Sequence, residues 1–391
     1  MRARPSVAAA TAVVLAALAL AGCSDDDEGA RPPTITASPS DEEPGSPTSE
    51  QTDEPTDEPT AESPTREDKP GPPRVVDVVA RNLAVPWGIA FLPNGTAIVT
   101  ERDTRRVLAI DDGRVAQIGL VESAAPQGEA GLLGVAVSPD FARDRAIFLY
   151  VTTAEDNRIV RTTYRRGRLG PLRVILDGIP NGFIHDGGRL QFGPDGYLYA
   201  STGETGAPEL APDRDSLGGK ILRITEDGDP APGNPDPDSP IWTLGHRNVQ
   251  GLAFDDDDNL WASEFGASTF DELNLIRKGG NYGWPRFEGR GDDPAYVNPQ
   301  VVWNTSEASP SGLAYLDGRL WLGALQGERL WRIDVTGGRA TAPTDFFVGR
   351  YGRLRTVVVA PDGNLWVSTS NRDGRATPGP DDDQIIVVDP G

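Results

Sequence analysis

Two histidines are the only imidazole side chains in this chain of 391 residues, and each stands in a glycine-containing, loop-like stretch. His185 lies in NGFIHDGG, and His246 lies in LGHRNVQG. A neutral imidazole accepts a proton near pH 7, so a histidine held in a loop is a candidate general base. A turn histidine in solvent is the alternative, and the residue type alone leaves both interpretations open.

Two arginines in GRLRTVVV supply a second candidate chemistry. Arg353 and Arg355 are two positions apart, so on a strand their side chains point to the same side. A guanidinium group binds a carboxylate through paired hydrogen bonds, so the pair could hold an anionic ligand. The alternative is pairing with surface acids, because the chain has 59 acidic and 37 basic residues and a formal net charge of −22.

Six similar segments must position these residues. Each has a small residue, an alternation of apolar residues, a turn rich in Pro, Asp, Asn or Gly, and a second alternation, which is typical of a β-hairpin. The segments recur about every 40–60 residues, with two weaker strands between them, which predicts an all-β, six-bladed β-propeller. They are GIAFLPNGTAIVTER, GVAVSPDFARDRAIFLYVTT, GRLQFGPDGYLYASTGE, GLAFDDDDNLWASEFG, GLAYLDGRLWLGALQG and TVVVAPDGNLWVSTSN.

We expect the ring to close through its two ends, with RVVDVVARNL and QIIVVDP pairing within one blade. A β-sandwich would not repeat one hairpin six times, and a solenoid has shorter, more regular units. Loops at one face of a propeller converge on its axis. Because His185 precedes the third hairpin and His246 the fourth, their two loops predict a shared pocket.

The N-terminal segment 1–23 has the pattern of a secretory signal peptide. Two arginines precede the apolar run VAAATAVVLAALAL, and small residues precede Cys23. LAGC resembles a bacterial lipobox, so we expect lipidation at Cys23 and a lipoprotein anchored on the extracytoplasmic side of a membrane. An ordinary signal peptide with an incidental cysteine is the alternative. Cys23 is the only cysteine, which excludes an intramolecular disulfide.

Residues 24–73 are rich in Pro, Thr, Ser, Asp and Glu and predict a disordered acidic tether, which leaves 74–391 for the propeller. The propeller is acidic as well, which makes a nucleic acid partner a poor fit and limits membrane contact to the lipid anchor. The runs DDDD at 255–258 and DDD at 381–383 lack the spacing of a calcium loop, so we expect solvated turns there.

Five segments in order resemble the soluble PQQ-dependent aldose sugar (glucose/sorbosone) dehydrogenase family: GEAGLLGVAVSPDF, HDGGRLQFGPDGYLYASTGE, LGHRNVQGLAF, DELNLIRKGGNYGWP and LRTVVVAPDG. The resemblance covers the chain from about Val75 to its end. It implies a six-bladed propeller that binds pyrroloquinoline quinone (PQQ) with calcium. The implied reaction is the oxidation of aldose sugars at the anomeric carbon to lactones, by hydride transfer to the quinone.

The resemblance also implies roles for individual residues. His185 matches the general base, Glu204 its orienting acid, and Arg247 a group that positions the cofactor and stabilises charge on the substrate oxygen. Two consecutive backbone carbonyls, those of Gly266 and Ala267, match the calcium ligands. The positions that match cofactor contacts are Glu129, Arg247, Asn248, Trp303, Thr305, Gln326, Arg353 and Arg355.

Four of these positions depart from the family pattern. Glu204 stands where the best-known relatives carry Asp, and Ala267 replaces a proline. Gln326 stands where a lysine is expected, and Glu129 where a glutamine is expected, so one cation is lost and one acid gained beside an anionic cofactor. These last two changes should weaken PQQ binding. The alternatives for Glu129 are a common variant of the broader family, or a base or metal partner in its own right, and the sequence leaves them open. Trp303 has a second interpretation as an ordinary core tryptophan.

The implied partners are an aldose substrate and an external electron acceptor, and the sequence leaves the sugar, the acceptor and the oligomeric state open. Two rival functions remain. A calcium-dependent lactonase on the same fold would need a cage of carboxylate and asparagine side chains at the ring centre, and no such set stands out. A propeller that only binds a ligand would be indifferent to PQQ.

Overall fold

The computed structural model describes residues 71–391, so Cys23, the predicted signal peptide and nearly all of the predicted tether lie outside the described residues. Within 71–391 the chain is almost entirely β-structure. The helices in this range are the four-residue α1 (Phe141–Asp144) and the 3₁₀ helix η1 (Pro208–Leu210). Neither of these described helices has the length and apolar character needed to cross a membrane.

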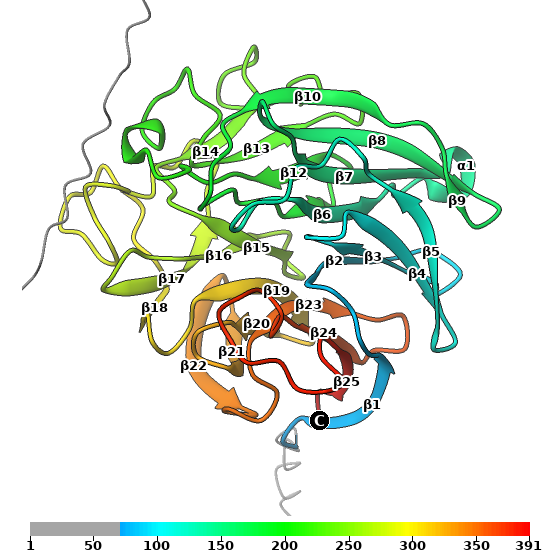
Figure 1. Ribbon diagram of the computed structural model, residues 1–391. Helices are drawn as coiled ribbons and strands as arrows, with labels where there is room; N and C mark the ends of the chain where they lie inside the picture. The colour runs from blue at the N-terminus through cyan, green and yellow to red at the C-terminus, as the bar shows by residue number, and fades with distance from the viewer. Residues whose placement is uncertain (1–70) are drawn as a thin grey trace, which may run out of the picture. The chain divides into compact units, whose positions relative to one another are not determined.

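The strands form six antiparallel sheets arranged around a common centre, as Figure 1 shows. This arrangement confirms the six-bladed propeller. Blade 1 comprises β2 (Pro86–Phe91), β3 (Ala97–Glu101), β4 (Arg106–Asp111) and β5 (Arg114–Leu120). Blade 2 comprises β6 (Leu132–Val137), β7 (Ala146–Thr152), β8 (Asn157–Arg165) and β10 (Arg173–Ile179), with β9 (Arg168–Leu169) paired to β8. Blade 3 comprises β11 (Leu190–Phe192), β12 (Leu198–Ser201), β13 (Lys220–Ile224) and β14 (Ile241–Leu244).

The remaining three blades follow the same meander. Blade 4 comprises β15 (Val249–Phe254), β16 (Leu260–Glu264), β17 (Phe270–Ile276) and β18 (Val301–Asn304). Blade 5 comprises β19 (Pro310–Leu316), β20 (Arg319–Ala324), β21 (Arg329–Thr336) and β22 (Arg339–Phe346). Blade 6 comprises β23 (Leu354–Val359), β24 (Leu365–Thr369), β25 (Ile385–Asp389) and β1 (Arg74–Ala80).

The ends of the domain pair in blade 6, which confirms the expected ring closure. Strand β1 lies antiparallel to β25, with Arg74 opposite Asp389. The Arg74 Nη2 atom lies 2.8 Å from the Asp389 Oδ2 atom. The outermost strand of the blade therefore comes from the opposite end of the domain, so the sheet cannot be completed until both ends are present.

Each predicted hairpin forms the two innermost strands of a blade, and neighbouring innermost strands contact one another in ring order. A glycine recurs at these contacts because the backbones crowd near the axis. A Cβ on Gly134 would collide with the carbonyl of Gly188 in the next blade, and one on Gly251 would collide with the carbonyl of Ser311. The glycine that begins five of the six repeats is thus a requirement of blade packing, and the sixth repeat begins with Thr356.

The core is divided into six apolar clusters, and each lies between two neighbouring blades. Trp261 of blade 4 packs with residues of blade 5, for example, and Trp321 of blade 5 packs with residues of blade 6. Both indoles are almost completely buried. Each blade therefore buries its two apolar faces against its neighbours, which makes the ring mutually supporting.

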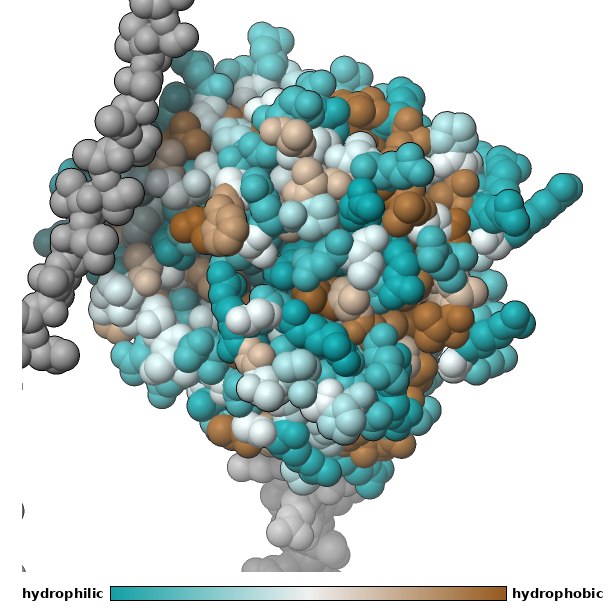
Figure 2. Space-filling view, viewed as in Figure 1, coloured by the Kyte–Doolittle hydropathy of each residue, from teal (hydrophilic) through white to brown (hydrophobic). Residues whose placement is uncertain are grey.

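Each acidic run is only partly exposed. Asp256, Asp257 and Asp258 are exposed, as expected, but the prediction was wrong at Asp255, which is buried and accepts a hydrogen bond from Trp261 Nε1 at 2.8 Å. The surface in Figure 2 is largely hydrophilic with scattered apolar residues. The prediction for the second run was wrong at Asp382 and Asp383, which are both buried. The Asp383 carboxylate accepts hydrogen bonds from the backbone N–H groups of Val85 and Asn371, so it joins blade 6 to the start of blade 1.

Candidate functional site

The candidate residues gather at one face of the ring for a topological reason. In an antiparallel meander, the first and third strands begin at the same face where the second and fourth strands end. Predicted site residues precede β6, β11, β15 and β23, or follow β12, β16, β18 and β20, while Arg355 lies near the start of β23 and Trp303 near the end of β18. All of them therefore stand at the same face, although they are spread over almost the whole domain.

His185 is held by a carboxylate from the neighbouring strand. Its Nδ1 atom lies 2.5 Å from the Oε1 atom of Glu204, which follows β12. The imidazole is 11% exposed and the Glu204 side chain 2%. An ionised carboxylate can only accept, so this contact places the proton on Nδ1 and leaves the lone pair on Nε2. Nε2 has no hydrogen-bond partner among residues 71–391, so it is free to accept a proton.

The backbone around His185 is fixed as tightly as its ring. His185 has a left-handed conformation with φ of 58°, which is uncommon for a residue with a side chain. Its N–H donates to Glu129 Oε2 at 3.0 Å, and its carbonyl accepts from Thr205 at 3.2 Å. A Cβ at position 203 would collide with that carbonyl, so Gly203 is what lets the loop lie against the end of β12.

The loop before β15 lies against the His185 loop. The Asn248 side-chain oxygen accepts the N–H of Gly187 at 3.0 Å, and the Arg247 carbonyl accepts the N–H of Glu204 at 2.9 Å. The Arg247 guanidinium lies 5.5 Å from the ring centroid of Trp284 and is half-buried. The structure therefore brings His185, Glu204, Arg247 and Asn248 together.

Four acids near Arg247 act on its charge. Burial lowers the pKa of Arg247, while the carboxylates of Glu204, Glu129, Glu264 and Glu288 oppose that effect. A partly desolvated cation next to an imidazole can stabilise negative charge that develops on a bound oxygen.

The two loops meet, as expected, but the side chain of His246 does not enter the pocket of His185. Its imidazole is completely buried and stacks on Tyr282, with ring centroids 4.6 Å apart. Nδ1 contacts Glu264 at 2.8 Å and Nε2 contacts Thr243 at 2.9 Å. Both ring nitrogens are occupied, so His246 supports the loop while its neighbour Arg247 faces the site.

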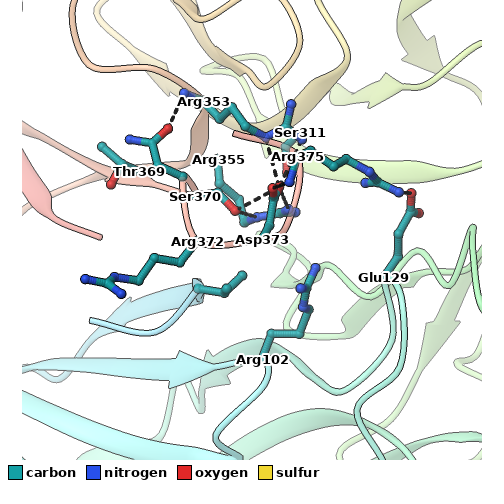
Figure 3. A network of polar contacts seen from close by, with 12 residues as sticks. Arg102, Glu129, Ser311, Arg353, Arg355, Thr369, Ser370, Arg372, Asp373 and Arg375 are labelled. Atoms are coloured by element: carbon teal, nitrogen blue, oxygen red, sulfur yellow. Dashed lines mark hydrogen bonds and ion pairs between the residues drawn. The ribbon is translucent and has the colours of Figure 1, made fainter. Parts of the chain in front are cut away.

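Arg353 and Arg355 converge on one buried carboxylate, that of Asp373 in the loop after β24 (Figure 3). Arg353 approaches Asp373 to 2.9 Å and Arg355 to 3.5 Å, and the three side chains are at most 5% exposed. Arg355 also bonds to Ser370 and Gln250. Two buried guanidinium groups share one carboxylate, so this group carries excess positive charge and favours an anionic ligand.

Arg375 was not predicted, yet it joins the two halves of the site. Figure 3 shows it extending from the loop after β24 to Glu129, and Nη2 donates to Oε1 at 2.9 Å. Burial alone would raise the pKa of Glu129, but the hydrogen bond from the His185 backbone and the charge of Arg375 outweigh it, so this pKa is lowered. The sequence around Arg375, NRDGRATPGP, has the composition of an ordinary loop and offered no signal.

Asp186 adds a second acid beside the histidine. Burial raises the pKa of Asp186 to about 7, against hydrogen bonds from Asn157 and Gly182 and with a further increase from the charge of Glu129. Its Oδ2 atom is buried and has no partner within the described chain. A carboxyl that is partly protonated near neutral pH therefore lies directly after the candidate base.

Known proteins are similar to this chain in fold and sequence. A family model described as Glucose / Sorbosone dehydrogenase matches residues 83–378. The chain belongs to the glucose/sorbosone dehydrogenase family. The structure of the PQQ-bound aldose sugar dehydrogenase from Streptomyces coelicolor is similar, with 51% sequence identity and a TM-score of 0.80 over 81% of this chain and 97% of that one.

Two Escherichia coli comparisons support membership of the glucose/sorbosone dehydrogenase family. The aldose sugar dehydrogenase YliI of Escherichia coli strain K12 is 31% identical over 336 residues, which cover 76% of this chain and 91% of that protein. The apo-form crystal structure of the soluble aldose sugar dehydrogenase from Escherichia coli has 28% identity and a TM-score of 0.74, and it covers 82% of this chain and 100% of that one.

The loop that the family resemblance assigns to calcium has a defined shape. Backbone N–H groups of Ala267, Ser268, Thr269 and Phe270 all donate to the Oε1 atom of Glu288. The carbonyls of Gly266 and Ala267 accept no backbone hydrogen bond from any residue in the described range. These two oxygens are thus available as ligands for a hard cation.

Three predicted cofactor positions make no side-chain hydrogen bond or ion pair with the other site residues in the described part of the chain. Trp303 is 5% exposed and packs against Trp331 with centroids 5.6 Å apart, in the cluster between blades 4 and 5. Thr305 is half-buried, and Gln326 is exposed in the turn between β20 and β21. All three stand at the face of the site, and their contact with a cofactor stays a prediction.

Proposed function

We propose that this protein oxidises aldose sugars at the anomeric carbon with PQQ and calcium, and that His185 is the general base. The observation that carries the proposal is the pairing of His185 with Glu204 at 2.5 Å, at the same face as a buried arginine pair. The 51% identity to a PQQ-bound aldose sugar dehydrogenase supports the same cofactor.

The residues present fit an anionic quinone. PQQ carries three carboxylates, and Arg353 and Arg355 place two guanidinium groups around the single carboxylate of Asp373. Their uncompensated charge is the feature that a polycarboxylate needs in an otherwise acidic protein. When bound, PQQ would supply the two-electron acceptor for the C–H bond of the sugar.

His185 would remove the proton of the anomeric hydroxyl. Glu204 accepts the Nδ1–H and so keeps the Nε2 lone pair directed away from the protein core. As Nε2 takes the proton, the imidazolium that forms lies against the Glu204 carboxylate, which stabilises it. Arg247 would stabilise the negative charge that grows on the substrate oxygen.

Calcium would bind the carbonyl oxygens of Gly266 and Ala267. Glu288 supports this proposal because it accepts four consecutive N–H groups of the loop and so orders the backbone that carries both oxygens. Because both ligands are main-chain oxygens, the replacement of a family proline by Ala267 should not alter calcium binding. A bound calcium ion would act as a Lewis acid next to the quinone.

A titration of PQQ into calcium-loaded protein tests the cofactor, and dye reduction with a panel of aldoses tests the reaction. We expect PQQ binding in the wild type and in His185→Ala, and turnover in the wild type only. Binding without turnover of any aldose would leave a PQQ-binding protein with another substrate. No binding and no change in melting temperature would favour the rival in which the propeller only recognises a ligand.

We also propose that the protein is exported and anchored at Cys23 by lipid, with the electrons passing to an external acceptor. The support is the signal-like segment, the lipobox-like LAGC and the acidic segment that follows. Labelling of cells with a radioactive fatty acid tests the anchor. We expect label in the wild type and none in Cys23→Ala, and an unlabelled wild type would contradict the proposal.

A further inference from the structure

Arg189, which precedes β11, is a buried cation that the proposed reaction does not use. Arg189 is 7% exposed. Nε donates to the carbonyl of Gln250 at 2.8 Å and Nη2 to the hydroxyl of Thr356 at 3.3 Å, so the side chain reaches from blade 3 to blades 4 and 6. The guanidinium carbon lies 4.3 Å from the ring centroid of Trp87 in blade 1.

No carboxylate within 71–391 forms an ion pair with Arg189. Its acceptors are a neutral carbonyl and a hydroxyl, and Nη1 has no acceptor in the part of the chain that is described. The nearby charged group is another cation, Arg355, whose guanidinium lies 6.0 Å from the same Trp87 ring. The one carboxylate that pairs with Arg355 is shared with Arg353. Positive charge around Arg189 and Arg355 is therefore in excess.

Burial, and then the charge of Arg355, lower the pKa of Arg189 to about 9. Arginine nevertheless keeps its proton in proteins, so the cost of burying the charge must be met by a counter-charge. The hydrogen bonds to Gln250 and Thr356 satisfy two donors without neutralising the cation.

Arg189 also lines a cavity of about 640 Å³ on the axis. The wall comes from the later residues of innermost strands in all six blades, whereas the candidate site lies where those strands begin. The cavity and His185 thus stand at opposite ends of the axis. The lining residues include Ile89, Val135, Arg189, Leu252, Leu313 and Val357, and also two acids, Asp255 and Asp258. The Asp255 carboxylate accepts hydrogen bonds from Asn259 and Trp261, and Asp258 is exposed.

We propose that this axial cavity is an anion-binding site, in which Arg189 holds a small monovalent anion, a halide or a short carboxylate. An anion that contacts the buried Arg189 must lose part of its hydration, which favours a weakly hydrated anion over a strongly hydrated one. The Nη1 donor and the planar guanidinium suit either ligand. The site is independent of the proposed oxidation and needs neither PQQ nor calcium.

Crystals soaked in sodium bromide test the position of the anion directly, because bromide can be located by its anomalous scattering. We expect an anomalous peak in the axial cavity within hydrogen-bonding distance of the Arg189 guanidinium. Bromide peaks beside Arg353 and Arg355 alone, with water next to Arg189, would overturn the proposal. This experiment uses the wild type and so does not depend on the folding of any variant.

Melting temperatures measured during a bromide titration test binding in solution, with sodium HEPES holding the ionic strength constant. We expect a saturable rise in the wild type and its loss in Arg189→Met. Arg114→Met is the matched control, since Arg114 is exposed and forms no ion pair with any described residue. Arg353→Met should keep the rise. A rise retained in Arg189→Met and lost in Arg353→Met would place the anion in the proposed cofactor site, against the proposal.

Acetate in place of bromide distinguishes a carboxylate site from a halide site, and a saturable response to either one supports the proposal.

Discussion

Arg375 and Glu129 form an ion pair across the candidate site, with Nη2 2.9 Å from Oε1, although 246 positions separate them in the chain. This ion pair bears on the negative charge that Glu129 adds to the site. An acid at position 129 adds negative charge beside the proposed cofactor, and Arg375 supplies a cation next to that acid. Glu129 in turn holds the backbone of His185.

Replacing Arg375 by Met should raise the pKa of Glu129. The folded-state pKa of Glu129 is lowered, so its contribution to stability is present above the unfolded value and is lost as pH falls through the folded one. Arg375→Met should therefore be destabilised at pH 7 by about 0.2–1 kcal/mol, because the Arg375 side chain is 47% exposed, and the difference should shrink toward pH 3. Melting curves against pH check this, with Arg114→Met as control. A difference that does not depend on pH would argue that the ion pair is not its cause.

Glu204→Gln should lower turnover by roughly 10²- to 10⁴-fold if His185 is the base. The amide has nearly the same shape, but it no longer offers two acceptor oxygens to the Nδ1–H of His185. The acidic limb of the pH–rate profile should shift, while PQQ affinity stays within a few-fold of the wild type. An unchanged profile with lower turnover would assign Glu204 a purely structural role.

Glu272 should make the protein less stable as pH rises. Burial, and then the charge of Glu264, raise the pKa of Glu272 to about 8. A raised folded-state pKa contributes stability below the unfolded value of about 4.5, and this contribution is lost as pH increases toward 8. The wild type should lose on the order of a few kcal/mol of unfolding free energy across this window, and Glu272→Gln should abolish that loss. Denaturant titrations between pH 5 and 9 measure it, and curves of equal slope for both proteins would refute the assignment.

Glu288→Ala should weaken calcium binding at least about 10-fold. The variant loses the acceptor of four consecutive N–H groups, so the carbonyls of Gly266 and Ala267 are no longer held in place. Ala267→Pro is the matched control, because it removes one of the four donors and keeps both carbonyls. Calcium titration by calorimetry gives both constants. Equal affinities in Glu288→Ala and the wild type would place the ion elsewhere.

Gly134→Ala should destabilise the fold by about 1–3 kcal/mol or more. The added Cβ would meet the carbonyl of Gly188 in the next blade, and backbone cannot move aside as a side chain can. Gly71→Ala is the control, since nothing lies closer than 4.0 Å to a Cβ there. Equal unfolding midpoints for the two variants would contradict the crowding of the innermost strands.

The pattern of residues was sufficient to predict the six blades, the closure of the ring and the face that carries the site. Alternating apolar residues and turn residues are local properties, and each blade repeats them. Loops that occupy the same place in such a repeat must meet at one face, so the roles proposed for His185, Glu204 and Arg247 depend on local spacing plus the family resemblance.

The tertiary structure decided the contacts between residues that are distant in the sequence. His246 and His185 occupy equivalent loops, yet only packing against Tyr282 and Glu264 shows that His246 is enclosed. Asp383 looked like part of a solvated turn, but it is buried between blade 6 and blade 1. The sequence by itself determined the repeat and the kinds of side chain in the loops at the face that carries the site. The partner of each charge depended on ring closure, which brings ends of the chain together by non-local packing that no local pattern encodes.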